Sequence, residues 1–279
     1  MTKYHESVLV KEVLDSLHLN TGSQIIDATL GTGGHSEAIL ALGAKVLGIE
    51  MDPKMIRIAG ERLASKNIII VQGNFTDIEK IANNNNFSHV DGILFDLGVS
   101  NLHLKEDGRG FSFENPNQIL DMRLNTETQS VRAMDLLNIL GKKQLIELFS
   151  KVMKYKDARN MAFGVFNHRP IETIADLEKV VTREDLSFKS KKINLMTLPL
   201  LALRIAVNSE LENLEEVLPK AISLLKTNGK LLVITFHSEE EKIIEKVLKG
   251  NFEIKLPSSS EIKKNNRSRS AKLYVYEKK

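Results

Sequence analysis

The chain has 279 residues, 42% of them hydrophobic and 27% charged, which is typical of a globular protein with one large core or a core plus an inserted module. It contains no cysteine, which excludes disulfides, thiolate metal sites and cysteine nucleophiles. The first residues lack the apolar core of a signal peptide, and no apolar run is long enough to cross a bilayer. We therefore expect a cytoplasmic protein with no membrane association, and we assign no metal site.

The net charge of +3 is unevenly distributed along the chain. Residues 255–279 carry eight Lys or Arg and two acids, a balance of +6, so residues 1–254 sum to −3. A basic segment on a slightly acidic body indicates a localised contact with a polyanion. A solvated tail explains the same charge run, and charge alone leaves both interpretations open.

Strands and helices alternate over the first third of the chain. The hydrophobic patterns predict, in order, a helix over 7–17, a strand over 24–29, a helix from about 35, a strand over 45–49, a helix over 53–66, a buried strand over 67–71, a short helix from 76 and a strand over 90–96. Such alternation implies right-handed crossovers and a parallel sheet covered by helices on both faces. The predicted fold class is therefore α/β.

The alternation stops after residue 96 and resumes with a helix over 210–225 and a buried strand over 230–236. Helical patterns such as 134–140 and 144–152 fill the interval, so we expect residues 105–192 to form an inserted helical domain for substrate recognition. Residues 1–104 and 193–279 would then form the core. The insertion follows the fourth strand, at the sheet edge where open α/β folds bind ligands. Segments 252–255 and 271–277 predict an antiparallel pair of strands that closes the sheet.

The most informative segment is Asp27-Ala-Thr-Leu-Gly-Thr-Gly-Gly-His35, which joins the first strand to its helix. Its glycines let a ligand approach the backbone closely, and the helix start offers free N–H groups. A dinucleotide fingerprint needs a third glycine where this chain has Ser36, which disfavours a nicotinamide enzyme. The pattern acid-x-x-x-Gly-x-Gly resembles motif I of class I methyltransferases, which hold S-adenosylmethionine. An ordinary tight turn is the alternative.

The acids around this loop suit the groups of that cofactor. Asp27 can hold the ammonium group directly or through water, while loop N–H groups hold the carboxylate. Glu50 and Asp52 follow the second strand one residue apart, and either can accept the ribose hydroxyls.

Seven further segments occur in order and carry a more specific resemblance. They are Tyr4-His-Glu-Ser-Val-Leu, Asp96-Leu-Gly-Val-Ser100, Arg109-Gly-Phe-Ser-Phe113, Leu120-Asp-Met-Arg123, Ala202-Leu-Arg-Ile-Ala-Val-Asn208, Phe236-His-Ser238 and Arg269-Ser-Ala-Lys-Leu273. With them the chain closely resembles the bacterial ribosomal RNA small-subunit methyltransferase H family, also called MraW, over about residues 4–277. The resemblance implies a class I methyltransferase domain with an inserted helical domain.

The activity that the resemblance implies is transfer of a methyl group from S-adenosyl-L-methionine to the exocyclic N4 of a cytidine in 16S rRNA, at the decoding centre. The partner would be 16S rRNA or a small ribosomal subunit particle, and the sequence leaves a homodimer open. A methyltransferase acting on DNA or protein is one alternative. A non-catalytic RNA-binding ribosome assembly factor is another, although the intact glycine loop argues against it.

The resemblance also assigns the cofactor site. Its positions map onto Gly33, Gly34, His35, Asp52, Phe75, Asp96 and His103. In this mapping Asp52, in preference to Glu50, takes the ribose, Phe75 packs along the adenine, and Asp96 lies near the reacting end of the cofactor. The family usually carries glutamine where this chain has His103; a hydrogen-bond donor survives the change, but its reach and titration differ.

The candidate catalytic residue is Asp96. The lone pair of the cytosine amine is delocalised into the ring, so an acceptor that holds one N–H would favour the tetrahedral geometry that attack requires. A backbone carbonyl within residues 97–100 can do the same. A strong base is unnecessary, because the amine becomes acidic once it is methylated.

The candidate substrate contacts lie in the insert and in the C-terminal part of the chain. They are Arg109, Phe111, Phe113, His237, Arg267 and Arg269. The two phenylalanines would share a face of an extended segment and stack the target base, or else pack inside the insert. The arginines would hold phosphates, and His237 would contact the substrate or form a structural hydrogen bond. Arg123 and Arg204 are alternatively structural ion-pair partners.

Overall fold

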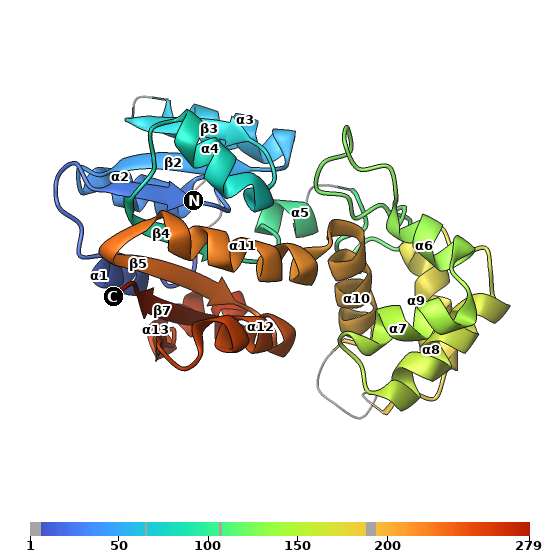
Figure 1. Cartoon of the computed structure of the whole chain (residues 1–279). Helices are drawn as coiled ribbons and strands as arrows, with labels where there is room; N and C mark the ends of the chain where they lie inside the picture. The colour runs from blue at the N-terminus through green and yellow to red at the C-terminus, as the bar shows by residue number, and fades with distance from the viewer. Residues whose placement is uncertain (1–6, 65, 106–107, 188–193) are drawn as a thin grey trace. The chain divides into compact units, whose positions relative to one another are not determined.

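In the computed structural model, which describes residues 7–64, 66–105, 108–187 and 194–279, the chain divides into two compact units (Figure 1). The first unit comprises residues 1–100 and 211–279, and the second comprises residues 101–210. The insert expected over 105–192 falls inside the second unit. Residues 194–210 also cluster there, because α10 (Thr197–Asn208) packs on α6 (Ala133–Ile139) and α7 (Lys142–Ser150).

Seven strands form one sheet in the first unit, in the order β3-β2-β1-β4-β5-β7-β6. The strands are β1 (Gln24–Asp27), β2 (Lys45–Glu50), β3 (Ile68–Gln72), β4 (Val90–Asp96), β5 (Leu225–Thr235), β6 (Glu253–Lys255) and β7 (Lys272–Glu277). The neighbours among β1 to β5 pair in parallel, whereas β7 pairs antiparallel with both β5 and β6. The α/β fold class is confirmed, as is the antiparallel closing pair, and the order is that of class I methyltransferases.

Helices cover both faces of this sheet. They are α1 (Val10–Leu17), α2 (Gly34–Ala41), α3 (Pro53–Leu63), η1 (Phe75–Asp77), α4 (Ile78–Asn84), α11 (Glu210–Leu224), α12 (Ser238–Leu248), α13 (Ser259–Lys264) and η3 (Asn266–Ser270). Successive strand residues point to opposite faces. Ile26 and Leu47 pack in the core formed with α4, α11 and α12, while Ile25 and Val46 pack in the core formed with α1 and α2.

The third strand differs from its prediction. The run of isoleucines predicts a buried strand, but β3 lies at the edge of the sheet, none of its residues is buried and Ile69 is 40% exposed. An apolar run does not report how many neighbours a strand has, so the prediction of burial was wrong while the strand itself is present. The predicted helix at the N-terminus is also present, although α1 begins at Val10 rather than at residue 7.

The second unit is helical, as expected. Its helices are α5 (Asn101–Lys105), α6, α7, α8 (Tyr155–Asn167), α9 (Ile174–Arg183) and α10. The aromatic ring of Phe149 is fully buried in this unit, together with apolar side chains of α8 and α9. Among the described residues, no helix of the chain combines the length and the apolar character that crossing a membrane requires.

Candidate cofactor and catalytic site

The turn between β1 and α2 brings bare backbone to the carboxyl edge of the sheet. Gly33 adopts a φ of 81° at the start of α2, and a Cβ there would lie 2.7 Å from Leu63 Cδ1. At Gly34 a Cβ would meet the Ser7 hydroxyl. Glycine is therefore favoured at both positions, most strongly at Gly33 because of its positive φ, and the first N–H groups of α2 are not covered by side chains of these two residues. Such a helix start is suited to a carboxylate.

Asp27, the acid of the loop motif, is fixed by the first turn of the same helix. Ser36 Oγ donates a 2.6 Å hydrogen bond to its Oδ2, and only 1% of the Asp27 side chain is exposed. Burial raises the pKa of Asp27, and the hydrogen bond from Ser36 opposes that shift. The sequence did not single out Ser36, because nothing but its place one residue after the glycine loop motif indicates this role.

His35, which is buried, and Asp96, which is half-buried, form a pair beside this loop. His35 Nε2 lies 3.4 Å from Asp96 Oδ2, and the Asp96 backbone N–H donates to Thr29 Oγ1 at 2.6 Å. Burial alone lowers the pKa of His35, but the carboxylate of Asp96, with smaller effects of Asp27 and Glu261, raises it above the ordinary value. The imidazole is thus held beside negative charge at the carboxyl end of β4.

This pair also retains unused hydrogen-bonding atoms. Both ring nitrogens of His35 and Oδ1 of Asp96 are buried and, within the described residues, meet no hydrogen-bond partner of normal geometry. Leaving a buried polar atom unpaired costs about 1–3 kcal/mol, so such atoms in a native fold indicate a place for a bound molecule. The bare glycine loop and these atoms together fit a polar ligand such as the expected cofactor.

The two acids after β2 have different surroundings. Glu50 is half-buried at the strand end; its Oε2 accepts from Gly31 N at 2.8 Å and its Oε1 from Met51 N and Asp52 N at 2.8 and 2.9 Å. Asp52 is 1% exposed, and its Oδ1 caps α3 by accepting from Lys54 N at 2.7 Å. Glu50 therefore connects the strand end to the glycine loop, whereas Asp52 initiates the next helix.

Phe75 begins η1, and two residues separate it from the end of β3. Its ring packs edge-on against Phe95 with centroids 5.6 Å apart, and the side chain is only half-buried. An aromatic ring anchored in this way at the carboxyl edge of the sheet is suited to pack against a flat heterocycle.

His103, Arg109 and Phe111 lie together in the second unit. The His103 and Phe111 rings are 5.3 Å apart, and the Arg109 guanidinium lies 5.5 Å from the Phe111 ring centre. Arg109 Nη1 donates to the carbonyl oxygens of Arg123 and Leu124, so this arginine helps to hold the loop that precedes α6. Phe111 is 6% exposed and Phe113 is 41% exposed, so the two phenylalanines do not share one environment.

Two other arginines are ion-pair partners, in agreement with the structural alternative. Arg123 Nε and Nη2 each donate to a different oxygen of Asp121 at 2.7 Å. Arg204 Nε and Nη2 donate to the two oxygens of Glu210, both at 2.9 Å. These bidentate pairs lie within the second unit and are geometrically suited to structural support.

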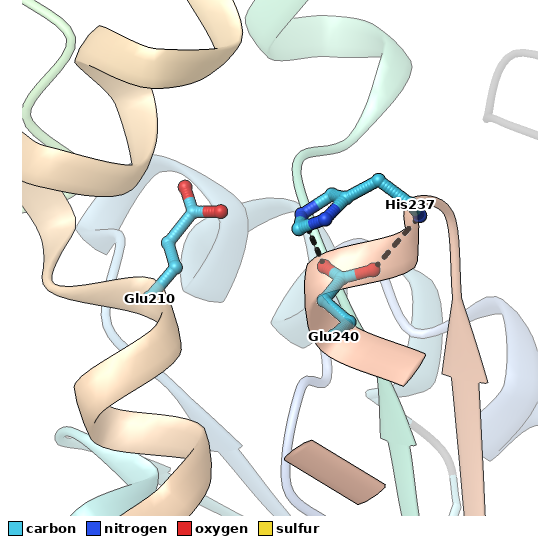
Figure 2. A group of neighbouring side chains, drawn as sticks. All are labelled: Glu210, His237 and Glu240. Carbon is cyan, nitrogen blue, oxygen red and sulfur yellow. Dashed lines mark hydrogen bonds and ion pairs between the residues drawn. The ribbon is translucent and has the colours of Figure 1, made fainter. Parts of the chain in front are cut away.

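His237 is the N-cap residue of α12, and its backbone N–H is bound by a side chain of the first turn. Figure 2 shows Glu240 turned back toward His237: Glu240 Oε2 accepts from the His237 N–H at 3.2 Å, and Oε1 lies 3.1 Å from Nε2. This contact supports the structural interpretation of His237. Glu210, also labelled in Figure 2, belongs to the second unit and pairs there with Arg204. Of the two C-terminal arginines, Arg269 is exposed, and the side chain of Arg267 lies outside the described residues.

Comparison with known proteins identifies the family. The sequence model of the MraW methylase family matches residues 2–259. The chain belongs to this family. A relative named ribosomal RNA small subunit methyltransferase H from Sulfurihydrogenibium sp. is 38% identical over 289 residues, covering 97% of this chain and 98% of the relative. A relative of the same name from Thermotoga neapolitana is 36% identical and covers 99% of this chain and 96% of its own length.

Solved structures were compared as well. An rRNA methylase from Streptococcus thermophilus has a TM-score of 0.48 at 11% identity, over 98% of this chain and 97% of that protein. A SAM-dependent O-methyltransferase from Thermotoga maritima has a TM-score of 0.47 at 10% identity, over 99% and 68%. Membership in the MraW methylase family rests on the sequence relatives, and it makes S-adenosylmethionine the cofactor of this chain. The glycine loop and the unpaired atoms of His35 and Asp96 fit that cofactor.

Proposed function

We propose that this MraW-family chain transfers a methyl group from S-adenosylmethionine to the exocyclic N4 of a cytidine in small-subunit ribosomal RNA, at the decoding centre. The sequence relatives carry the name of a small-subunit rRNA methyltransferase, which supports the substrate class. The observation that carries the chemistry is the His35–Asp96 pair, in which Oδ1 of Asp96 is left as a buried acceptor beside the glycine loop.

The bound cofactor supplies an already activated methyl group, so the protein chiefly has to align the acceptor amine. Alignment alone can contribute about 7–11 kcal/mol toward the barrier. Asp96 Oδ1 accepts one N–H of the amine and directs the nitrogen lone pair, while His35 holds the other carboxylate oxygen. The proton that the amine releases after methylation passes to Asp96 or to water, which requires no strong base.

We infer that the remaining cofactor contacts come from Gly33, Gly34 and Phe75, and from one acid after β2. The resemblance favours Asp52 for the ribose. Exposure supports Glu50 instead, because Asp52 is 1% exposed whereas Glu50 is half-buried at the strand end; both carboxylates already accept backbone N–H groups. His103, in the second unit, stays a proposal that the resemblance alone supports.

Recognition of the RNA is proposed for the second unit together with the basic C-terminal segment. Arg269 is exposed there and is a candidate phosphate contact. Arg109 and Phe111 are engaged within their own unit, which favours an indirect role in shaping the surface. Phe113, at 41% exposure, is the better candidate for stacking on a base.

The decisive experiment uses small ribosomal subunits from cells that lack this gene. The purified chain and methyl-labelled S-adenosylmethionine are added, and nucleosides are analysed by mass spectrometry. We expect N4-methylated cytidine to appear in the rRNA. An unchanged level would exclude this substrate and leave DNA or protein as the acceptor. Calorimetry that detects no binding of S-adenosylmethionine would instead favour an assembly factor without catalysis.

A further inference from the structure

An exposed face of α8 carries three aromatic side chains and an arginine. Tyr155, Arg159, Phe163 and Phe166 are spaced by four, four and three residues, which places them along one side of the helix. Tyr155 is 69% exposed, Phe163 37% and Phe166 40%. The opposite side of α8 is buried in the core of the second unit. Three large aromatic side chains are thus left at the surface of a small helical domain.

Cations lie over these rings. Lys142 Nζ, from the start of α7, is 4.5 Å from the ring centre of Phe163 and 4.7 Å from that of Phe166. The guanidinium of Arg159 is 5.6 Å from Phe163, and that of Arg169 is 4.8 Å from Phe166. We call Lys142, Tyr155, Arg159, Phe163 and Phe166 the α8 face. Figure 1 shows α7 and α8 side by side within this unit.

The surroundings of the α8 face are strongly basic. Residues 142–169 contain seven Lys or Arg and two acids, a balance of +5. One of the acids, Asp157, is 2% exposed and accepts from Ser187 N and Oγ, so it does not reach the surface. Lys142, Lys154 and Arg159 pair with no carboxylate among the residues that the structure describes. These three cations are therefore available to an external anion.

We propose that the α8 face binds single-stranded RNA, with bases stacking on the phenylalanine and tyrosine rings and phosphates contacting the neighbouring cations. Stacking platforms interleaved with positive charge are how proteins hold single strands without reading every base. The flexible side chains of Lys142 and Arg159 can leave a ring face to a base and still reach the adjacent phosphate. The proposal rests on the proposed function, since it takes the substrate to be an RNA.

A purely internal role explains part of the same geometry. The rings and cations can form a ladder that fastens α7 to α8, and Arg169 already donates to the Leu137 and Leu140 carbonyls at the end of α6. A structural ladder, however, does not account for Lys154, which pairs with no carboxylate among the described residues, or for the 69% exposure of Tyr155. The two roles predict different results when single-stranded RNA is added.

The first test uses the absence of tryptophan from the sequence. The full chain is prepared as Phe163→Trp and as Phe166→Trp, so that each variant holds a single tryptophan, and a 12-nucleotide single-stranded RNA is titrated in. We expect emission to be quenched, because a stacked base lies against the indole. Ile139→Trp, at a position that is 79% exposed in the same unit, is the matched control and should be unaffected. Equal emission changes in all three variants, or none, would overturn the proposal.

The second test removes the rings while keeping apolar volume. We expect Phe163→Leu/Phe166→Leu to weaken binding of the single strand by about tenfold or more, and Ile139→Ala to leave it unchanged. Thermal melting and S-adenosylmethionine binding confirm that each variant is folded. Unchanged RNA affinity with a lowered melting temperature would establish the structural ladder and refute the RNA role. Equal wild-type affinity for an anionic lipid vesicle, with the same loss in the double variant, would refute it in favour of a membrane surface.

These outcomes separate the proposal from the proposed function. If the α8 face does not bind RNA, the wild-type chain still methylates the small-subunit rRNA and the double variant does so at the same rate. If the proposed function is wrong, no N4-methylated cytidine forms with any variant, while the quenching and affinity measurements remain interpretable by themselves.

Discussion

Replacing Asp96 tests the chemistry most directly. Its Oδ2 lies 3.4 Å from His35 Nε2, and its Oδ1 is the buried acceptor that we assign to the target amine. A hydrogen bond that involves a charged group contributes about 1.5–3 kcal/mol. Asp96→Ala should therefore slow methyl transfer by about 10- to 150-fold. Asp96→Asn keeps an acceptor oxygen without the charge, so its loss should be about half as large in free energy.

The assay is single-turnover methylation of small subunits from cells that lack the gene, with cofactor affinity measured separately by calorimetry. Asp91→Asn is the matched control, because Asp91 lies at the opposite end of the same strand and pairs with Lys226. The control should keep the wild-type rate. A rate for Asp96→Ala within a factor of about two of wild type, at saturating cofactor, would refute the role of Asp96 as acceptor.

The same substitution has a pH signature. Asp96 is the main cause that raises the pKa of His35 above 6.5, against the opposing effect of burial. A histidine whose folded pKa is raised adds stability that is fully present below the unfolded value and is lost as the pH rises through the folded value. Asp96→Asn should therefore be most destabilising near pH 5.5 and less so near pH 7.5 (about 1 unit on either side of ordinary histidine). Proton NMR should show a lower pKa for His35 in the variant, and an unchanged value would contradict the pairing.

Three further predictions concern the cofactor loop. Glu50→Gln should weaken S-adenosylmethionine binding more than Asp52→Asn does, as measured by calorimetry. Asp52→Asn should mainly lower stability through the cap of α3, by about 0.5–2 kcal/mol, as measured by melting curves. The reverse order of affinities would restore Asp52 as the ribose ligand. Ser36→Ala removes the hydrogen bond that opposes the raised pKa of Asp27, so the pKa of Asp27 should rise further. A raised carboxyl pKa costs stability when the group is ionised, so the loss of stability should be larger at pH 8 than at pH 5 (about 1 unit above the ordinary Asp value). A loss that does not depend on pH would argue against this role of Ser36. Gly33→Ala should lower the free energy of unfolding by about 1–3 kcal/mol and reduce cofactor affinity, because φ is 81° and the new Cβ meets Leu63. A variant with wild-type stability and affinity would show that the loop does not need this conformation.

The arrangement of the candidate cofactor residues could be predicted from the sequence because its parts are local. Asp27 ends a strand, Gly33 and Gly34 start the next helix, and the sheet order then places Asp96 at the same edge. Each position follows from strand ends at short spacing, which periodicity and glycine positions report directly. The choice between Glu50 and Asp52 for the proposed ribose contact was less accessible, since a single residue separates them and only their hydrogen bonds distinguish a loop clamp from a helix cap.

The candidate substrate contacts were harder to predict from the sequence, for a different reason. Whether Phe111 and Phe113 share a face depends on the conformation of the loop before α6. Packing within the second unit sets that conformation, and the local sequence does not. The rings and the arginine of α8 have a helical spacing that is readable in the sequence, but Lys142 joins them from another helix. The spacing alone does not distinguish a binding surface from a core, because the same spacing on a buried face would be typical of core packing. Only the exposure of these side chains in the structure separates the two.

Asp27, His35 and Asp96 form an electrostatic network beside the glycine loop. Burial is the main cause that raises the pKa of Asp27; the nearby charge of His35 opposes that rise, and the charge of Asp96 adds to it. Burial lowers the pKa of His35, whereas Asp96 and Asp27 raise it above the ordinary value. Two carboxylates around one imidazole therefore favour positive charge at this edge of the sheet. The sulfonium and the ammonium of the cofactor carry such charge, so the electrostatics that raise the pKa of His35 also favour the cofactor.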